Sequence, residues 1–212
     1  MSTLEIHWPR HRAPTQQMWS WSSPNSHLTV TLLHDQPLRG SRRVWLANMS
    51  VRGWSDTSEV VVKFARGREE LAMLEAEAAL YDNELRYLQG SFVPVCHGLF
   101  KGSGGMQGGL VLDYRPGRDW EKCPPHYYEQ FSIATRRLQD AGVTHGDLFS
   151  KGHFRMTSNG PCIVHFSRAT QHDCHPYCEE LQAFTSACTS LGPRHHHPSY
   201  DHPPMYEQYA MF

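Results

Sequence analysis

A short stretch of the chain combines side chains that can exchange protons. His145 and Asp147 are separated by Gly146 in a His-x-Asp turn, and a short apolar run at residues 162–166 follows after a spacer of mixed polarity. The carboxylate of Asp147 in such a turn could accept a proton from a hydroxyl group, as a general base does. The turn is therefore the first candidate site, and the elements before it must position it.

A lysine in an apolar strand is the second feature with chemical content. Residues 59–65 include three consecutive valines followed by Lys63, a pattern that favours a strand buried on both faces, where an ammonium group needs a partner. Apolar residues then recur at steps of three and four, which predicts an amphipathic helix over residues 71–88 that Gly90 ends. Glu77 lies at the edge of its apolar stripe, so we expect Lys63 to contact Glu77. The alternatives are an ion pair without any ligand, or a Lys63 side chain that extends to the edge of the sheet.

The order of these features resembles the protein-kinase-like fold, and most closely the short kinase-like proteins common in fungi. That group carries His-x-Asp and Asp-Phe-Ser-Arg-Ala segments followed by His-x-Cys, and the second segment reads His-Phe-Ser-Arg-Ala here, at residues 165–169. The resemblance implies an α+β, two-lobed protein-kinase-like fold with a truncated C-terminal lobe. It also implies that Asp147 is the catalytic residue and that Lys63 and Glu77 bind the phosphates of a nucleotide.

Two positions depart from the pattern of that family. Gly152 stands where the family has a metal-binding Asn, and His165 stands where it has a metal-binding Asp. Magnesium prefers oxygen ligands, and neither Gly152 nor His165 offers a side-chain oxygen, so both protein ligands of the metal ion are lost. Lys63 is retained and could still bind the phosphates of ATP. The resemblance therefore implies a degenerate pseudokinase that binds partners, with weak or no nucleotide binding.

Two alternatives to the pseudokinase remain open. In a shifted alignment His153 takes the Asn role, or Lys151 neutralises phosphate charge, and the protein is then an active ATP-dependent phosphotransferase on protein or small-molecule substrates with an atypical metal site. Alternatively, the protein is a metal-binding interaction module. Its zinc ligands would come from residues 172–178, which contain two His and two Cys, and from the histidines at 195–197.

Changes in composition along the chain predict four segments. Residues 1–27 show no sustained period and are expected to form an extended arm that contains three tryptophans. Residues 28–114 form a small sheet-rich lobe with one helix, and a Pro/Gly break at residues 115–118 leads into a helical lobe over 115–192. Residues 193–212, rich in His and Pro, are expected to be a loosely ordered tail.

The composition narrows the classes of partner. The 20 basic and 21 acidic residues give a formal charge of -1, which does not favour nucleic acid. No run approaches the about 20 apolar residues of a membrane span, and the first residues lack the pattern of a signal peptide. Six cysteines without repeated spacing favour reduced thiols. We therefore expect a cytoplasmic protein with an unidentified protein partner, no bound nucleic acid and no membrane contact.

Overall fold

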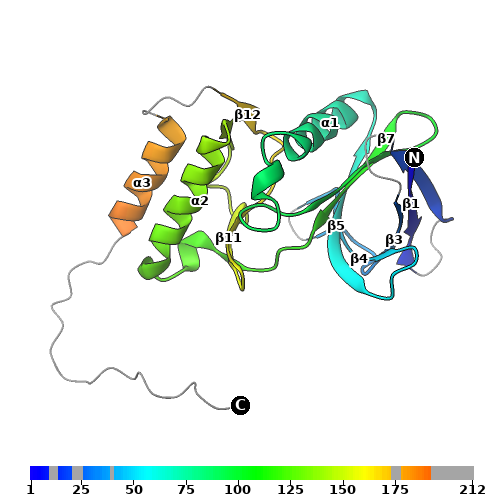
Figure 1. Cartoon of the computed structure of the whole chain (residues 1–212), viewed down its shortest axis with the longest axis horizontal. Coiled ribbons are helices and arrows are strands. Elements are labelled where there is room, and N and C mark those ends of the chain that lie inside the picture. The colour runs from blue at the N-terminus through cyan, green and yellow to red at the C-terminus, as the bar shows by residue number, and fades with distance from the viewer. Residues whose placement is uncertain (10–13, 21–25, 39–40, 173–177, 192–212) are drawn as a thin grey trace, which may run out of the picture.

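A closed β-barrel dominates the computed structural model, which describes residues 1–9, 14–20, 26–38, 41–172 and 178–191 (Figure 1). Seven strands are hydrogen-bonded in the order β1-β2-β6-β7-β5-β4-β3. The strands are β1 (Ser2–His7), β2 (Gln16–Ser20), β3 (His27–Leu32), β4 (Val44–Val51), β5 (Thr57–Arg66), β6 (Cys96–Lys101) and β7 (Gln107–Asp113). The barrel closes because β1 pairs antiparallel with β2 and parallel with β3.

Alternating side chains fill the interior of the barrel. Successive residues of a strand point to opposite faces, so every second residue enters the core. Leu4 and Ile6 of β1 and Val60 and Val62 of β5 follow this rule and are fully buried. Together with apolar residues from the other five strands they form one continuous cluster. Two of the seven strands thus come from residues 1–27, the segment expected to be an arm.

The predicted α+β, two-lobed protein-kinase-like fold is wrong. The structure is mostly β, and its largest element is a closed barrel instead of a small open sheet in one of two lobes. The physical reason is the added pair β1–β2, whose apolar residues complete the interior and remove the free edges of the sheet. Because the kinase-like fold is absent, the structure gives no support to ATP binding or to transferase activity.

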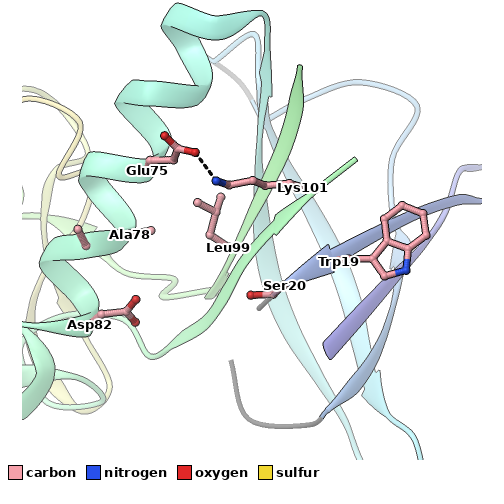
Figure 2. A pocket seen from close by; sticks show the side chains of 8 residues that line it. Trp19, Ser20, Glu75, Ala78, Asp82, Leu99 and Lys101 are labelled. Carbon is pink, nitrogen blue, oxygen red and sulfur yellow. Dashed lines mark ion pairs between the residues drawn. The ribbon is translucent and has the colours of Figure 1, made fainter. Parts of the chain in front are cut away.

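One helix, α1 (Arg68–Asp82), packs on the outside of the barrel. The helix was expected to continue to Leu88, but the chain turns after Asp82 and forms a short 3-10 helix, η2 (Arg86–Leu88). Asn83 helps to end α1, because its side-chain amide donates to the carbonyl of Ala79 at 2.8 Å. A cavity of about 250 Å³ lies between α1 and the barrel. Figure 2 shows the residues that line it, among them the ion pair between Glu75 of the helix and Lys101 of β6.

The chain after β7 forms a smaller region with two helices and two small sheets. Its elements are β8 (Arg118–Asp119), η3 (Trp120–Lys122), η4 (Pro125–Tyr127), α2 (Tyr128–Asp140), β9 (Val143–Thr144), β10 (Phe154–Thr157), β11 (Gly160–Ile163), β12 (Thr170–Gln171) and α3 (Glu179–Leu191). The sheets have the strand orders β11-β10-β8 and β12-β9. Three fully buried rings, Phe131, Phe154 and Phe184, pack in its core, with Phe154 within 4.6 Å of Phe131 and 5.5 Å of Phe184 between ring centroids.

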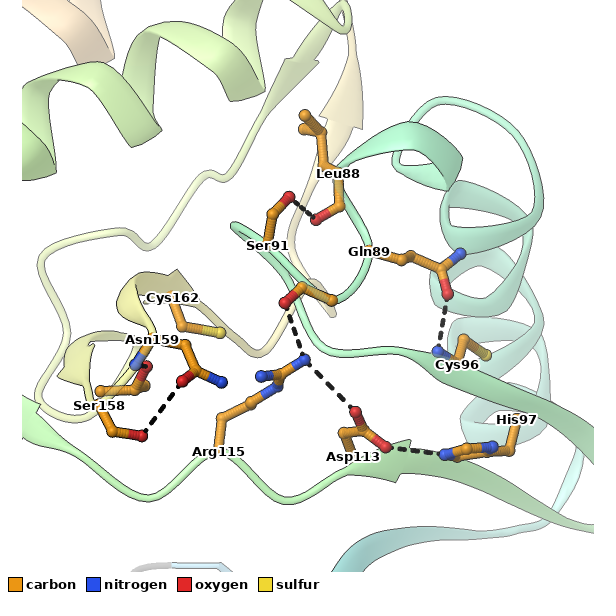
Figure 3. A network of polar contacts seen from close by, with 12 residues as sticks. Leu88, Gln89, Ser91, Cys96, His97, Asp113, Arg115, Ser158, Asn159 and Cys162 are labelled. Carbon is orange, nitrogen blue, oxygen red and sulfur yellow. Dashed lines mark hydrogen bonds and ion pairs between the residues drawn. The ribbon is translucent and has the colours of Figure 1, made fainter.

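A polar network fixes the connection between the barrel and this region (Figure 3). The guanidinium of Arg115 donates to the carbonyl of Gly90 at 3.1 Å and to Asp113 at 3.4 Å, and Asp113 pairs with His97 at 2.8 Å. Gly117 follows, and a Cβ there would lie 2.5 Å from the carbonyl oxygen of Met156. The chain must therefore pass close to β10, and the two regions are held together by specific contacts. Among the described helices, none has the length and apolarity to cross a bilayer.

Candidate functional site

Lys63 lies on β5, between β4 and β7 in the wall of the barrel. Val62 beside it faces the barrel interior, so Lys63 points to the other face, toward α1. Its ammonium donates to Oε1 of Glu77 at 2.5 Å, and the two side chains are 10% and 2% exposed. The predicted contact between Lys63 and Glu77 is therefore confirmed. Each charge depends on the other, because a single buried charge without a partner is strongly destabilising.

Glu77 also reaches the segment after β11. The same Oε1 atom accepts the backbone N–H of Phe166 at 3.1 Å, and the ring of Phe166 packs edge-on against Tyr81 with centroids 5.7 Å apart. One carboxylate thus joins the barrel, α1 and the smaller region. The geometry describes a structural junction, and the nucleotide-binding role assigned to Lys63 and Glu77 stays a prediction.

His165 lies next to this junction in an uncommon backbone conformation. Its φ angle is 76°, a region that residues other than glycine rarely adopt. Its ring stacks on His153 with centroids 4.5 Å apart and an interplanar angle of 25°. Burial, together with the nearby charge of Lys63, lowers the pKa of His165 to about 4. This histidine is therefore neutral at physiological pH.

Asp147 lies in the turn after β9 and remains partly accessible. Its carboxylate accepts a hydrogen bond from the hydroxyl of Ser150, and this bond is the main reason that the pKa of Asp147 is lowered. The backbone carbonyl of Asp147 accepts Nδ1–H of His153 at 2.9 Å. A row of contacts therefore runs from Asp147 through His153 to His165 and reaches the Lys63 junction. The structure brings all the predicted site residues except Gly152 into this row.

Two side chains hold the turn in place, one of them fully buried and the other partly buried. His145 donates from Nε2 to the carbonyl of Val164 at 3.0 Å and accepts the N–H of Asp147 at Nδ1, 3.2 Å away. These bonds require the neutral imidazole, and burial lowers the pKa of His145 to about 4. Glu180 of α3 accepts the backbone N–H groups of His145 and Gly146 at 2.8 and 2.9 Å. The carboxylate of Glu180 thus fixes the turn to α3.

The residues at the expected metal positions do not fit magnesium. Gly152 has no side chain, and its carbonyl accepts the guanidinium of Arg155 at 2.8 Å. His165 offers a neutral nitrogen, while the carboxylate of Asp147 is bound to Ser150. His153 does not replace the missing Asn, because an imidazole supplies nitrogen and no oxygen, and its Nδ1 already donates to a carbonyl. In the described part of the chain no group of three or more His, Cys, Asp or Glu side chains has an arrangement that could hold a metal ion.

The segment expected to bind zinc is only partly described. His172 contacts the hydroxyl of Thr144 at 3.0 Å, and the sulfur of Cys178 accepts a hydrogen bond from the amide of Gln139 at 2.8 Å. Both side chains therefore take part in packing contacts within the smaller region. Residues 173–177 and the histidines at 195–197 lie outside the described residues.

A pocket of about 500 Å³ opens beside Asp147, and sequence reasoning missed it. Its lining includes three carboxylates, from Asp147, Glu179 and Glu180, and no Lys or Arg side chain among the described residues. Phe149 also lines it and is 38% exposed. The two consecutive glutamates at the start of α3 could have been noticed in the sequence. Their position opposite Asp147 depends on how α3 folds back, which no local pattern indicates.

Comparison with known proteins assigns no family to the chain. No protein-family model matches it, and no curated protein matches it in sequence. The function of the protein must therefore be inferred from the geometry of the site.

Proposed function

We propose that the protein acts by binding a protein partner, and that the acidic pocket around Asp147 receives a basic side chain of that partner. The observation that carries this proposal is the lining of the pocket, where three carboxylates lie together and none of the described lining residues is a Lys or Arg. Charge complementarity of this kind favours a cationic group and speeds its association.

The carboxylates differ in their availability. Glu180 is held by two backbone N–H groups and serves mainly to shape the pocket. Asp147 is kept ionised by the hydroxyl of Ser150, and Glu179 is exposed at the start of α3. Asp147 and Glu179 are therefore the two groups that we expect to contact the incoming Lys or Arg.

An apolar surface lies beside the carboxylates. The exposed ring of Phe149 packs against Trp120 and Phe184, with centroids 6.1 Å away in each case. Because these two neighbours are buried, Phe149 is supported in a fixed position and offers a rigid apolar contact. We infer that the partner presents a basic residue next to an aliphatic residue.

Phosphotransfer is not part of this proposal, for two reasons. The ammonium of Lys63 is already bound to Glu77 in a buried pair, and the positions of Gly152 and His165 supply no oxygen side chain for a metal ion. Asp147 could orient a hydroxyl, but orientation alone does not neutralise the charge of a transferred phosphate. The same carboxylate is better suited to bind a cation.

The test uses a fluorescein-labelled peptide in which Arg alternates with Leu, and a matched peptide with Gln in place of every Arg. Fluorescence anisotropy is expected to show saturable binding of the basic peptide alone. The double variant Asp147→Asn/Glu179→Gln should bind at least about tenfold more weakly, which corresponds to about 1.4 kcal/mol.

The matched control is Glu121→Gln/Glu129→Gln, which removes the same charge from exposed positions that do not line the pocket. Equal weakening in both double variants, or no binding of the basic peptide, would overturn the proposal. Magnesium-dependent transfer of phosphate from ATP that is lost in Asp147→Asn would also contradict it and would restore the phosphotransferase alternative.

A further inference from the structure

One end of the barrel opens into a second pocket that is unrelated to the acidic one. Its lining residues come from the end of β5, the starts of β2, β4 and β7, the connection before β4, the residue after β1 and the first turn of α1. The pocket has a volume of about 370 Å³. Mouths of β-barrels are frequent positions for small-molecule sites, and a volume of roughly 300–1,000 Å³ is typical of them.

Three aromatic rings form the floor of this barrel mouth. Trp8 stacks on Phe64 with centroids 5.6 Å apart and an interplanar angle of 22°, and it meets Trp45 edge-on at 5.4 Å. All three are only partly buried and pack on the apolar interior of the barrel. The rings therefore close the barrel from within and leave aromatic surface on the side of the pocket.

The rim of the mouth is cationic. Arg42, Arg43 and Arg66 line it, and Glu70 is the single carboxylate among the lining residues. Glu70 pairs with Arg43 and also accepts the backbone N–H of Arg66 at 2.9 Å. Among the described residues, no ion pair engages the guanidinium of Arg42 or Arg66, so two exposed positive charges lie beside an aromatic floor.

A pair of amides completes the rim. The side chain of Gln16 donates to that of Gln107 at 2.8 Å, which ties the start of β2 to the start of β7 across the mouth. Each of these amides keeps a further polar atom that can face a ligand. The mouth thus offers aromatic surface, guanidinium donors and amide groups within one enclosed volume.

We propose that the barrel mouth binds a small anionic aromatic molecule, with its planar ring against Trp8, Trp45 and Phe64 and its carboxylate, sulfonate or phosphate between Arg42 and Arg66. Planar guanidinium groups recognise such anions with paired hydrogen bonds. Stacked and edge-on contacts with aromatic floors favour flat rings over aliphatic chains. The volume of about 370 Å³ fits one ring system.

The first probe is naphthalene-1-sulfonate, titrated into the full chain by isothermal titration calorimetry, with neutral 1-naphthalenemethanol as the comparison ligand. One-to-one binding of the sulfonate is expected, with at least about tenfold weaker binding of the neutral alcohol. The double variant Arg42→Gln/Arg66→Gln should reduce the affinity for the sulfonate to that for the alcohol.

The control variant is Arg52→Gln, because Arg52 is exposed in the β4–β5 turn, at the other end of β4 from Trp45. The affinity of Arg52→Gln for the sulfonate should equal that of the wild type.

NMR signals of the indole N–H groups give the location of the bound ligand, since those of Trp8 and Trp45 should shift on binding and that of buried Trp120 in the smaller region should not. Absence of saturable binding of the sulfonate, 1-naphthoate and 1-naphthyl phosphate, or an equal loss in both arginine variants, would overturn the proposal. Neither result affects the acidic pocket, whose test uses different residues and a cationic probe.

Discussion

The Lys63 junction and the acidic pocket lie at the two ends of one row of polar contacts, yet their charges are handled in opposite ways. At the junction, one cation and one anion are buried together and neutralise each other at 2.5 Å. In the pocket, three carboxylates share a cavity of about 500 Å³, and none of its described lining residues is a Lys or Arg. The junction is already neutralised internally, whereas the pocket is the place where we propose that a cation of a partner binds.

This difference shows why residue type alone does not identify a binding residue. Glu77 and Glu179 are the same amino acid on the first and third α-helix of the described chain. Glu77 is 2% exposed and bound by two donors, so it stabilises the fold, while Glu179 is exposed and lines a pocket. The comparison can be tested by separating effects on stability from effects on binding.

The largest expected effect is at the junction. Glu77→Ala leaves the ammonium of Lys63 buried without its partner, and we expect it to lower the free energy of unfolding by about 3–5 kcal/mol. Chemical denaturation in urea, followed by tryptophan fluorescence, measures this change. The double variant Lys63→Met/Glu77→Leu replaces both charges with apolar groups of similar size and should recover most of the loss.

A loss in the double variant as large as that in Glu77→Ala would show that the pair does more than neutralise charge. The hydrogen bond from Phe166 to Glu77 would then be the main contribution, because it is lost in both variants. A loss below about 1 kcal/mol in Glu77→Ala would contradict the description of a buried, mutually dependent pair.

The second prediction concerns the turn that positions Asp147. Gly146 has a φ angle of 74°, and a Cβ there would lie 2.6 Å from the carbonyl oxygen of Arg168. Gly146→Ala combines an unfavourable backbone conformation with this overlap, so we expect it to destabilise the protein by about 2–4 kcal/mol and to weaken binding of the basic peptide.

Gly53→Ala provides the matched control. Gly53 has a φ angle of 90°, but an added Cβ would meet no atom within 4 Å. Its cost should be limited to the backbone conformation, about 1–2 kcal/mol, with no effect on peptide binding. Equal destabilisation in the two variants would mean that the close approach to Arg168 relaxes without difficulty.

The third prediction is a pH dependence. The pKa values of His145 and His165 are about 4 in the folded protein and near the ordinary 6.5 when unfolded. Between these values the unfolded chain binds more protons, so stability is fully present above pH 6.5 and is lost as the pH falls toward 4. We expect His145 to account for about 3 kcal/mol of this loss.

Urea denaturation of the wild type and His145→Gln at several pH values checks this dependence. The variant should be less stable at pH 7 but should lose less stability between pH 6.5 and pH 4. Glu180 acts in the opposite direction near the lower limit, since burial raises its pKa and favours the folded state as it becomes protonated. Parallel curves for the two proteins would show that His145 is not responsible.

Much of the local structure was predictable from the sequence. The strand that carries Lys63 and the helix that carries Glu77 follow from apolar periodicity, because each buries apolar residues against a neighbour. The contact between Lys63 and Glu77 followed from the need of a buried ammonium for a partner. In each case one physical requirement acts within a short stretch of chain.

The closure of the barrel could not be predicted in the same way. Leu4 and Ile6 alternate with polar residues, but a strand of six residues gives too short a pattern to identify a partner. Its pairing with β3 is parallel and depends on a core completed by seven strands. The acidic pocket was not predicted for a similar reason, because Glu179 and Asp147 line one pocket only after α3 has packed against α2.

The smallest expected effect concerns an ion pair on the surface. Lys101 pairs with Glu75 at the cavity between α1 and the barrel, as Figure 2 shows, but both side chains are more than 40% exposed. Water and salt screen such a pair, so Lys101→Gln should change the free energy of unfolding by less than about 1 kcal/mol in the same urea experiment. The ratio of this change to that in Glu77→Ala measures how much burial strengthens the dependence of one charge on its partner. A change in the free energy of unfolding as large as that in Glu77→Ala would mean that the exposed ion pair holds α1 to the barrel as strongly as the buried pair does. Glu77 would then not be the main residue that joins α1 to the barrel.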